Sequence, residues 1–292
     1  MSLGIALSIL SALLFAGSDV AKKVLSASTP MFVVIWIPVT WGVLVGGSYF
    51  LIQGIPSFDS AVVFPLAIMS ALILVLIEVL FMRVISRAEI SLVVPLLSFA
   101  PITAGAFAWL VSGEVPAAGA YLGIALIVIA SWLMYAEPRD RRALLRPLVR
   151  LLSDPNARLM LLLCLVDGIF VNLMHAGGKA APPSFFVWLV LVFEWLVLTT
   201  TMVVRRITPH TAIIRTPTLV FATGFLWTAG MVAFFESLAH TIVAYSMAAN
   251  RTHALFVVIL GAYTFGEHEL RKRLAAAALM VCGVAILIVS DA

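Results

Sequence analysis

Four polar residues interrupt the apolar stretch LLLCLVDGIFVNLMHAGGK, which covers residues 161–179: Asp167, Asn172, His175 and Lys179. Positions 167, 171, 175 and 179 recur every four residues, so they share one face of a helix. A carboxyl group such as that of Asp167 is costly inside a membrane span, and by default it faces a cavity and marks a functional site. The chemistry open to this stretch is the binding of a charged ligand or the exchange of a proton.

Two further charged residues are predicted to lie at the same depth as Asp167. At 1.5 Å per residue, Asp167, Glu194 and Arg251 lie about 14 to 17 Å from the ends of their apolar runs. The hydrocarbon core is about 30 Å thick, so all three should sit near its centre. Arg251 can form a structural ion pair with Glu194 or with Asp167 that fixes helix packing. Alternatively, Arg251 binds a substrate carboxylate or phosphate in two-point fashion, while an acid takes an amine or a proton.

Several other polar or aromatic residues are candidates for the same pocket. Asn250 and His253 are spaced i, i+3 beside Arg251, and Trp41 could hold an amine against its ring face. The predicted substrate-binding residues are Asp167, Asn172, Glu194, Asn250, Arg251, His253 and Trp41. The candidates for proton coupling are Asp167, Glu194 and His175, because burial of a carboxyl group suits it to proton exchange.

Charged residues on the first and third apolar runs also have structural interpretations. Asp19 with Lys22 or Lys23 predicts a pair within one helix, near its end. Glu78 either pairs with Arg83 or lines the mouth of a pathway.

The composition requires that most of the chain lie in a membrane. Of 292 residues, 63% are hydrophobic and 11% are charged, whereas a soluble domain carries roughly 25% charged residues. Cys164 and Cys282 both lie in apolar runs without disulfide or metal spacing, which is typical of packing residues. The N-terminal segment lacks the basic region of a signal peptide, so we expect it to be a retained first helix.

Apolar runs bounded by turn residues predict ten transmembrane helices: residues 3–25, 31–52, 61–85, 89–111, 117–136, 158–179, 183–204, 217–239, 241–264 and 271–290. Pro95 and Pro101 fall inside the fourth span, where they should interrupt the helix. Residues 137–157 form a basic linker, part of which reads as a helix lying at the membrane surface.

The distribution of Lys and Arg predicts the orientation. With ten spans, sixteen of the eighteen basic residues fall in loops on one side, and only Lys179 falls on the other. Basic loops are retained in the cytoplasm, which places both termini outside. We expect a multi-pass protein of the inner (plasma) membrane of a bacterium.

A constant offset of 153 residues predicts an internal duplication. It aligns Gly113-Glu114 with Gly266-Glu267, Pro30 with Pro183, and Phe81 with Phe234. The expected fold is therefore all-α, with residues 1–136 as a first five-helix repeat, 137–157 as the linker, and 158–292 as a second repeat. Five is odd, so the second repeat is inverted. Inverted repeats are a transporter architecture with the substrate site near the midplane.

The stretches SRAEISLVVPLLSFAPITAGAFAWLVSGE and AHTIVAYSMAANRTHALFVVILGAYTFGE resemble the EamA-like branch of the drug/metabolite transporter superfamily. In that family a fourth helix rich in small residues leads into a Gly-Glu pair once per repeat. The resemblance implies a ten-helix transporter of amino acids, drugs, nucleotide sugars or other metabolites. Glu114 and Glu267, which end the two stretches, should cap or brace turns. EamA-like proteins are usually drawn with cytoplasmic termini, so the charge bias here departs from the family.

A shorter resemblance concerns the segment VDGIFVNLMH. It is similar to the first helix of the small multidrug resistance proteins, in which an acid and a basic residue eight positions later carry substrate and protons. Asp167 takes the acid position and His175 the basic one.

Motifs of catalysis and of ATP hydrolysis are missing from the sequence. It contains no phosphate-binding loop, no H-E-x-x-H, no G-x-S-x-G and no paired cysteine ligands. We therefore expect no enzyme, no catalytic residues, no cofactor and no metal site. The expected partners are a small-molecule substrate, H⁺ as a coupling ion and the lipid bilayer, without nucleic acid or an obligate protein partner.

These observations predict a secondary-active exporter of a small polar or zwitterionic metabolite, such as an amino acid, that works by alternating access. One alternative is a carrier of an organic cation or quaternary amine in an aromatic and acidic pocket. An alternative of another class is a flippase for a lipid-linked substrate.

Overall fold

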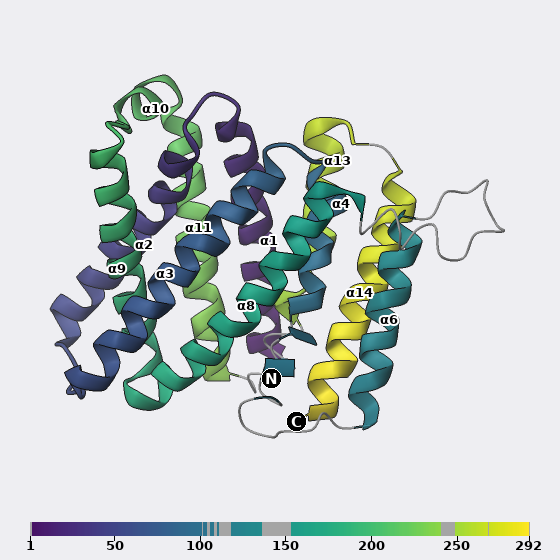
Figure 1. Cartoon of the computed structure of the whole chain (residues 1–292), viewed down its shortest axis with the longest axis horizontal. Helices are drawn as coiled ribbons and strands as arrows, with labels where there is room; N and C mark the ends of the chain where they lie inside the picture. The colour runs from purple at the N-terminus through teal and green to yellow at the C-terminus, as the bar shows by residue number, and fades with distance from the viewer. Residues whose placement is uncertain are drawn as a thin grey trace.

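The computed structural model describes residues 2–100, 102–103, 106–107, 110, 118–135, 153–240, 249–267 and 269–291, and every regular element in them is helical. The helices are α1 (Ser2–Ser26), α2 (Met31–Gln53), α3 (Ser60–Ile85), α4 (Ile90–Val93), the 3₁₀ helix η1 (Val94–Phe99), α6 (Ala118–Tyr135), α8 (Pro155–Ala180), α9 (Pro183–Val204), α10 (His210–Arg215), α11 (Pro217–His240), α13 (His253–Phe265) and α14 (Leu270–Asp291). Figure 1 shows their arrangement.

For eight of the ten predicted spans, all but the fourth and the ninth, the predicted boundaries agree closely with these elements, because the residues at the boundaries have local roles. Asp59 caps α3 by accepting a 2.9 Å hydrogen bond from Ala61 N, and Asp154 caps α8 through Asn156 N at 3.0 Å. Pro183 and Pro217 occupy first helical positions, where a missing N–H costs nothing. α10 was not predicted, and most of the 137–157 linker lies outside the described residues.

Six of the described helices are long and apolar enough to cross a membrane, namely α1, α2, α3, α8, α9 and α11. Shorter apolar helices cover Ile90–Phe99, Tyr121–Ala130 and His253–Phe265. The described part of the chain is thus all-helical, and its six long apolar helices indicate a multi-pass membrane protein. The count of ten spans stays a prediction.

Two predicted spans are broken within their length. The fourth begins as α4, which gives way to η1 at Val94, one residue before Pro95. Proline lacks the N–H that would continue the α-helical bonds, which explains the change. In the ninth, a turn at Arg251 and Thr252 separates helical residues 249–250 from α13. Breaks of this kind at membrane depth are tolerated where they are buried in protein or line a cavity.

Helices from the two halves of the chain pack against one another in pairs. α1 lies against α11, α3 against α8, α2 against α9 and α6 against α14 (Figure 1). α2 and α9 exchange two similar hydrogen bonds, from Trp36 Nε1 to Thr199 Oγ1 at 2.9 Å and from Trp195 Nε1 to Thr40 Oγ1 at 3.0 Å. The halves are therefore interleaved rather than separate.

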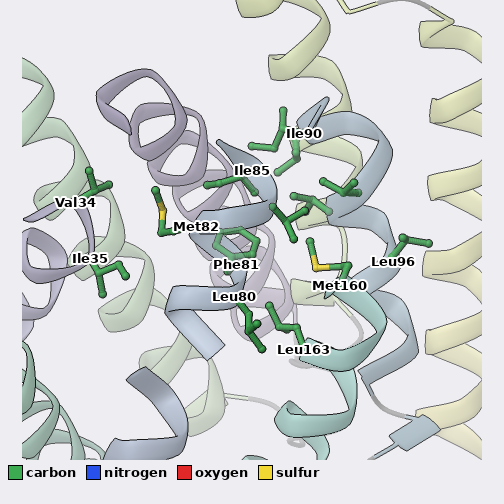
Figure 2. Packing of buried hydrophobic residues seen from close by; sticks show 14 of the residues in the cluster. Val34, Ile35, Leu80, Phe81, Met82, Ile85, Ile90, Leu96, Met160 and Leu163 are labelled. Atoms are coloured by element: carbon green, nitrogen blue, oxygen red, sulfur yellow. The ribbon is translucent and has the colours of Figure 1, made fainter. Parts of the chain in front are cut away.

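Buried apolar side chains from α2, α3, α4, η1 and α8 fill the space between these pairs (Figure 2). The residues labelled there are Val34, Ile35, Leu80, Phe81, Met82, Ile85, Ile90, Leu96, Met160 and Leu163. A second cluster gathers around Phe186 of α9, with Phe50 and Val63. The two clusters hold in place the helices that carry the buried charges described next.

Candidate functional site

Lys22 lies at the centre of a buried group of charges. Its side chain is only 2% exposed, and its Nζ lies 3.5 Å from Glu78 Oε2 and 3.9 Å from Asp19 Oδ1. The predicted pair of Asp19 with Lys22 is therefore present. The alternative in which Glu78 pairs with Arg83 is wrong, because Glu78 faces Lys22 on α1 while Arg83 is exposed. A buried ammonium needs such carboxylates to offset its loss of water.

Glu194 of α9 is the third acid of this group. It is 1% exposed and lies within electrostatic range of Lys22 and Glu78. Its Oε1 has no hydrogen-bond partner among the described residues, and the same holds for Glu78 Oε2.

His253, the first residue of α13, connects this group to the second break. Its Nε2 lies 2.9 Å from Asp19 Oδ2. We call Asp19, Lys22, Glu78, Glu194 and His253 the Lys22 cluster. It joins α1 and α3, from the first half of the chain, to α9 and α13, from the second.

Arg251 and Asp167 form a neighbouring group at the break before α13. Arg251 lies within electrostatic range of the Asp167 carboxyl group. Asn250 Nδ2 donates a 3.0 Å hydrogen bond to Ser11 Oγ of α1. A cavity of about 30 Å³ is lined by Val94, Leu97, Ser98, Asn250, Arg251, His253 and Ala254. This volume suits a water molecule rather than a substrate.

The predicted site residues thus fall into separate groups. Glu194 and His253 belong to the Lys22 cluster, whereas Asp167 lies within electrostatic range of Arg251. Asn172 Nδ2 donates to Gly168 O of its own helix at 2.8 Å. Trp41 packs edge-on against Phe221 of α11, with ring centroids 5.3 Å apart. The side chain of His175 lies outside the described residues.

A larger cavity, of about 480 Å³, lies among α2, α9 and α11. Its aromatic lining comes from Tyr49, Phe50, Trp188 and Trp227, and Glu236 also contributes to it. At its other end it reaches Leu191, one helical turn from Glu194. Volumes of this size are typical of small-molecule sites.

A separate charged group ties the ends of four segments together near the predicted cytoplasmic side. Glu267 Oε1 accepts hydrogen bonds from Ile90 N at 2.9 Å and from Lys23 Nζ at 3.1 Å. Its Oε2 accepts from Ser91 N at 3.0 Å and from Ser91 Oγ. Arg273 bonds Glu89 and donates to Ser91 Oγ at 2.6 Å. We call Lys23, Glu89, Ser91, Glu267 and Arg273 the Glu267 latch.

The expectation that Glu267 caps a turn is confirmed, although it caps α4 of the first half rather than its own turn. Glu114 lies outside the described residues. Sequence reasoning missed Lys22 as the centre of a site. The signal available was a lysine and an aspartate on one face of an apolar helix, which also fits an intrahelical pair.

Comparison with known proteins agrees with this architecture. No curated protein matches the chain. A solved structure described as "Crystal structure of protein" is similar over 96% of both chains, with a TM-score of 0.59 and 11% sequence identity, which shows a shared fold. Residues 2–136 match the model of the EamA-like transporter family, which confirms, for this part of the chain, the resemblance that the sequence predicted.

Proposed function

We propose that the chain is a secondary-active transporter that exports a small polar or zwitterionic metabolite, such as an amino acid, by alternating access. The observation that carries this proposal is a half-buried acid and a half-buried arginine close to each other beside the helix break before α13. Asp167 and Arg251 offer an acid for an amine and a guanidinium for a carboxylate, beside the turn at Arg251 and Thr252. Broken helices at the midplane are typical of transporter substrate sites.

The helix pairing supports an inverted repeat of five plus five helices. At the offset of 153 residues, the pair α1 with α11 corresponds to α8 with α3, and both pairs are in contact. In the pairs α2 with α9 and α6 with α14, the two helices that are in contact are each other's equivalents at this offset. Two halves arranged in this way can exchange conformations, which gives inward-open and outward-open states of similar energy.

The small cavity beside Arg251 supports an occluded conformation. A substrate would need η1 and the start of α13 to separate before it could reach Arg251 and Asn250. The larger cavity among α2, α9 and α11 would then serve as a vestibule. We further propose coupling to protons, for which Asp167, Glu194 and His175 are the candidates.

A second function, transport of an organic cation, is favoured by the larger cavity. Its aromatic rings, including Trp188 and Trp227, can hold an amine, and Glu236 supplies a negative charge. The substrate would then enter between helices and would not need Arg251.

We propose that the basic loops face the cytoplasm of a bacterium and that both termini lie outside its inner membrane. The two ends of the chain lie on one side of the bundle in Figure 1, and α10 lies on the other. Arg205, Arg206 and Arg215 flank or belong to α10, which supports this orientation.

The test is the thermal stability of the purified protein in the presence of amino acids, quaternary amines and polyamines. A ligand that binds only the folded state raises the melting temperature with its concentration. We compare wild type with Asp167→Asn and Arg251→Gln, and use Arg83→Gln, which removes an exposed arginine, as the matched control.

Stabilisation of wild type and Arg83→Gln by zwitterions, lost in Arg251→Gln, supports the metabolite exporter. Stabilisation by cationic amines that survives in Arg251→Gln favours the organic-cation carrier. Transport into proteoliposomes of the ligand that stabilises the protein then completes the test. A stabilising ligand that is not transported would overturn both proposals.

A further inference from the structure

The Lys22 cluster contains more acids than bases. Asp19, Glu78 and Glu194 supply three carboxyl groups, whereas Lys22 supplies one ammonium and His253 one imidazole. With all three acids ionised, the net charge is −2 when His253 is neutral and −1 when it is charged. Such an excess in a buried site is unfavourable, so a further positive charge is expected to bind.

The contacts show which acid lacks a partner. Asp19 has His253 at 2.9 Å and Lys22 at 3.9 Å. Glu78 has Lys22 at 3.5 Å. Glu194 is 1% exposed, and its Oε1 has no hydrogen-bond partner in the described part of the chain. The surplus negative charge would therefore fall on Glu194.

A proton is the ligand that fits this position best. Glu194 Oε1 is enclosed, and no group of His, Cys, Asp and Glu side chains in the described residues could hold a metal ion. A proton needs no cavity and no further ligands. It turns the carboxylate into a neutral acid that is also a hydrogen-bond donor. Glu78, whose Oε2 pairs with Lys22 at 3.5 Å but accepts no hydrogen bond, faces the same lysine.

We propose that the Lys22 cluster is a proton-binding site in which Glu194 carries the proton and Lys22 is the cation that replaces it. On release, the O–H bond of Glu194 breaks and the proton passes to water on the open side. The Lys22 ammonium then moves from Glu78 towards the new Glu194 carboxylate, so that the charge stays compensated. Asp167 lies outside this cluster, within electrostatic range of Arg251.

This arrangement links proton release to the relative position of the two halves. Lys22, Asp19 and Glu78 lie on α1 and α3, whereas Glu194 and His253 lie on α9 and α13. A movement of α1 and α3 against α9 changes the separation of Lys22 and Glu194. The coupling of the proton to transport rests on the proposed function, but the bound proton does not.

The first experiment is infrared spectroscopy of the purified protein at pH 7, which detects the carbonyl stretch of a protonated carboxyl group. We expect a protonated-carboxyl band in wild type, its loss in Glu194→Gln and its retention in Glu236→Gln, which removes an exposed carboxyl group. Retention of the whole band in Glu194→Gln would overturn the assignment. If Glu194→Gln does not fold, Glu194→Asp is used, and the band must shift in frequency.

The second experiment tests Lys22. In Lys22→Met the three acids lose the ammonium that offsets their charge. The melting temperature should therefore fall at pH 8 and recover towards pH 5, where the acids are protonated. Addition of Glu194→Gln should restore part of the melting temperature lost at pH 8. A melting temperature without this pH dependence would contradict the role of Lys22. Stabilisation by NaCl over choline chloride at equal concentration, with no carboxyl band, would overturn the proton in favour of a metal cation.

The third experiment separates this inference from the proposed function. In proteoliposomes, a pH gradient should drive transport in wild type and in Glu269→Gln, which removes an exposed carboxyl group outside both cavities, but not in Glu194→Gln, which should still exchange substrate. If the carboxyl band depends on Glu194 but the rate of transport does not depend on the pH gradient, the proton-binding site is supported and its coupling to transport is overturned. Absence of any transport, with the band intact, would overturn only the transporter proposal.

Discussion

The carboxylate of Glu267, between α13 and α14, accepts a 3.0 Å hydrogen bond from the backbone N–H of Ser91, in the first turn of α4. This bond joins residues 176 positions apart and brings a loop of the second half onto a helix of the first. The side chain of Glu267 is only 4% exposed, and Lys23 Nζ lies 3.1 Å away. The Glu267 latch therefore closes this end of the bundle.

Substitution of Glu267 by Gln should destabilise the protein. The amide has the same shape, but it removes the negative charge that accepts from Lys23 and from the first turn of α4. Hydrogen bonds to a charged group contribute about 1.5 to 3 kcal/mol, so we expect a loss of about 2 kcal/mol. Thermal unfolding in detergent measures the change.

The matched control is Glu269→Gln, two residues further along. Glu269 is exposed and pairs only with Lys272 of its own segment, at 3.2 Å, so its substitution should have little effect. Equal losses for the two variants would show that the Glu267 latch adds no stability.

The Glu267 latch should also make stability depend on pH. Burial alone raises the pKa of Glu267, but hydrogen bonds from Ser91 and from Lys23, with the charge of Lys23, outweigh it and lower the pKa below its ordinary value. A pKa that is lower in the folded state gives stability that is present above the unfolded pKa, about 4.3, and is lost as pH falls through the folded value.

The measurement is the difference in melting temperature between wild type and Glu267→Gln as a function of pH. This difference should be constant from pH 7 to about 5 and should shrink at lower pH. A difference that grows towards acid pH would contradict the pKa assignment.

The helices could be predicted from the sequence because each depends on a local run of residues. The predicted span 183–204 coincides with α9, and Pro95 lies where α4 gives way to η1. Both rest on properties of a single segment, namely its length of apolar residues and the missing N–H of proline.

The side-chain partners could not be predicted in the same way, because they depend on how each helix is rotated about its axis. Glu78 and Arg83 are close in sequence, but a spacing of five residues puts them about 140° apart around a helix. The partner of Glu78 is Lys22, 56 positions away. Depth alone grouped Asp167 with Glu194, whereas their helices turn them towards different neighbours.

A pair of adjacent glycines on α8 provides a test of the helix packing. A Cβ atom added to Gly177 would lie 2.0 Å from Cζ of Phe186, a fully buried ring of α9, whereas one added to Gly178 would meet nothing closer than Pro183 Cγ at 3.7 Å. Gly177→Ala should therefore destabilise the protein by about 1–3 kcal/mol through overpacking.

Gly178→Ala is the control, because it changes the same residue type one position away. In a helix it should be neutral or stabilise by up to about 1 kcal/mol. The measurement is the melting temperature of each variant, and that of Gly177→Ala should be the lower. If both variants unfold at the same temperature, the close contact of α8 with Phe186 is not rigid.

The basic residues of the Glu267 latch have no basic equivalents around Glu114, the residue that corresponds to Glu267 in the first proposed repeat. At the offset of 153 residues, Lys23 corresponds to Ala176 and Arg273 to Ala120, so Glu114 would lack both cations. The two ends should then differ in the free energy needed to open them. The structure is closed where the cations are present.

Opening of the Glu267 latch should expose the cavity beside Arg251 to the side of the basic loops. Ala254 lines that cavity and is 5% exposed, so Ala254→Cys, with Cys164 and Cys282 replaced by Ala, should react slowly with a membrane-impermeant thiol reagent. Addition of Glu267→Gln removes about 2 kcal/mol from the stability of the closed state, so the reaction rate should rise about tenfold or more.

The control is Ser28→Cys, in the exposed loop after α1, which should react rapidly with or without Glu267→Gln. Inside-out vesicles should show the increase and right-side-out vesicles should not. An unchanged rate, or an increase only from the outer face, would show that Glu267 does not control access from the cytoplasm.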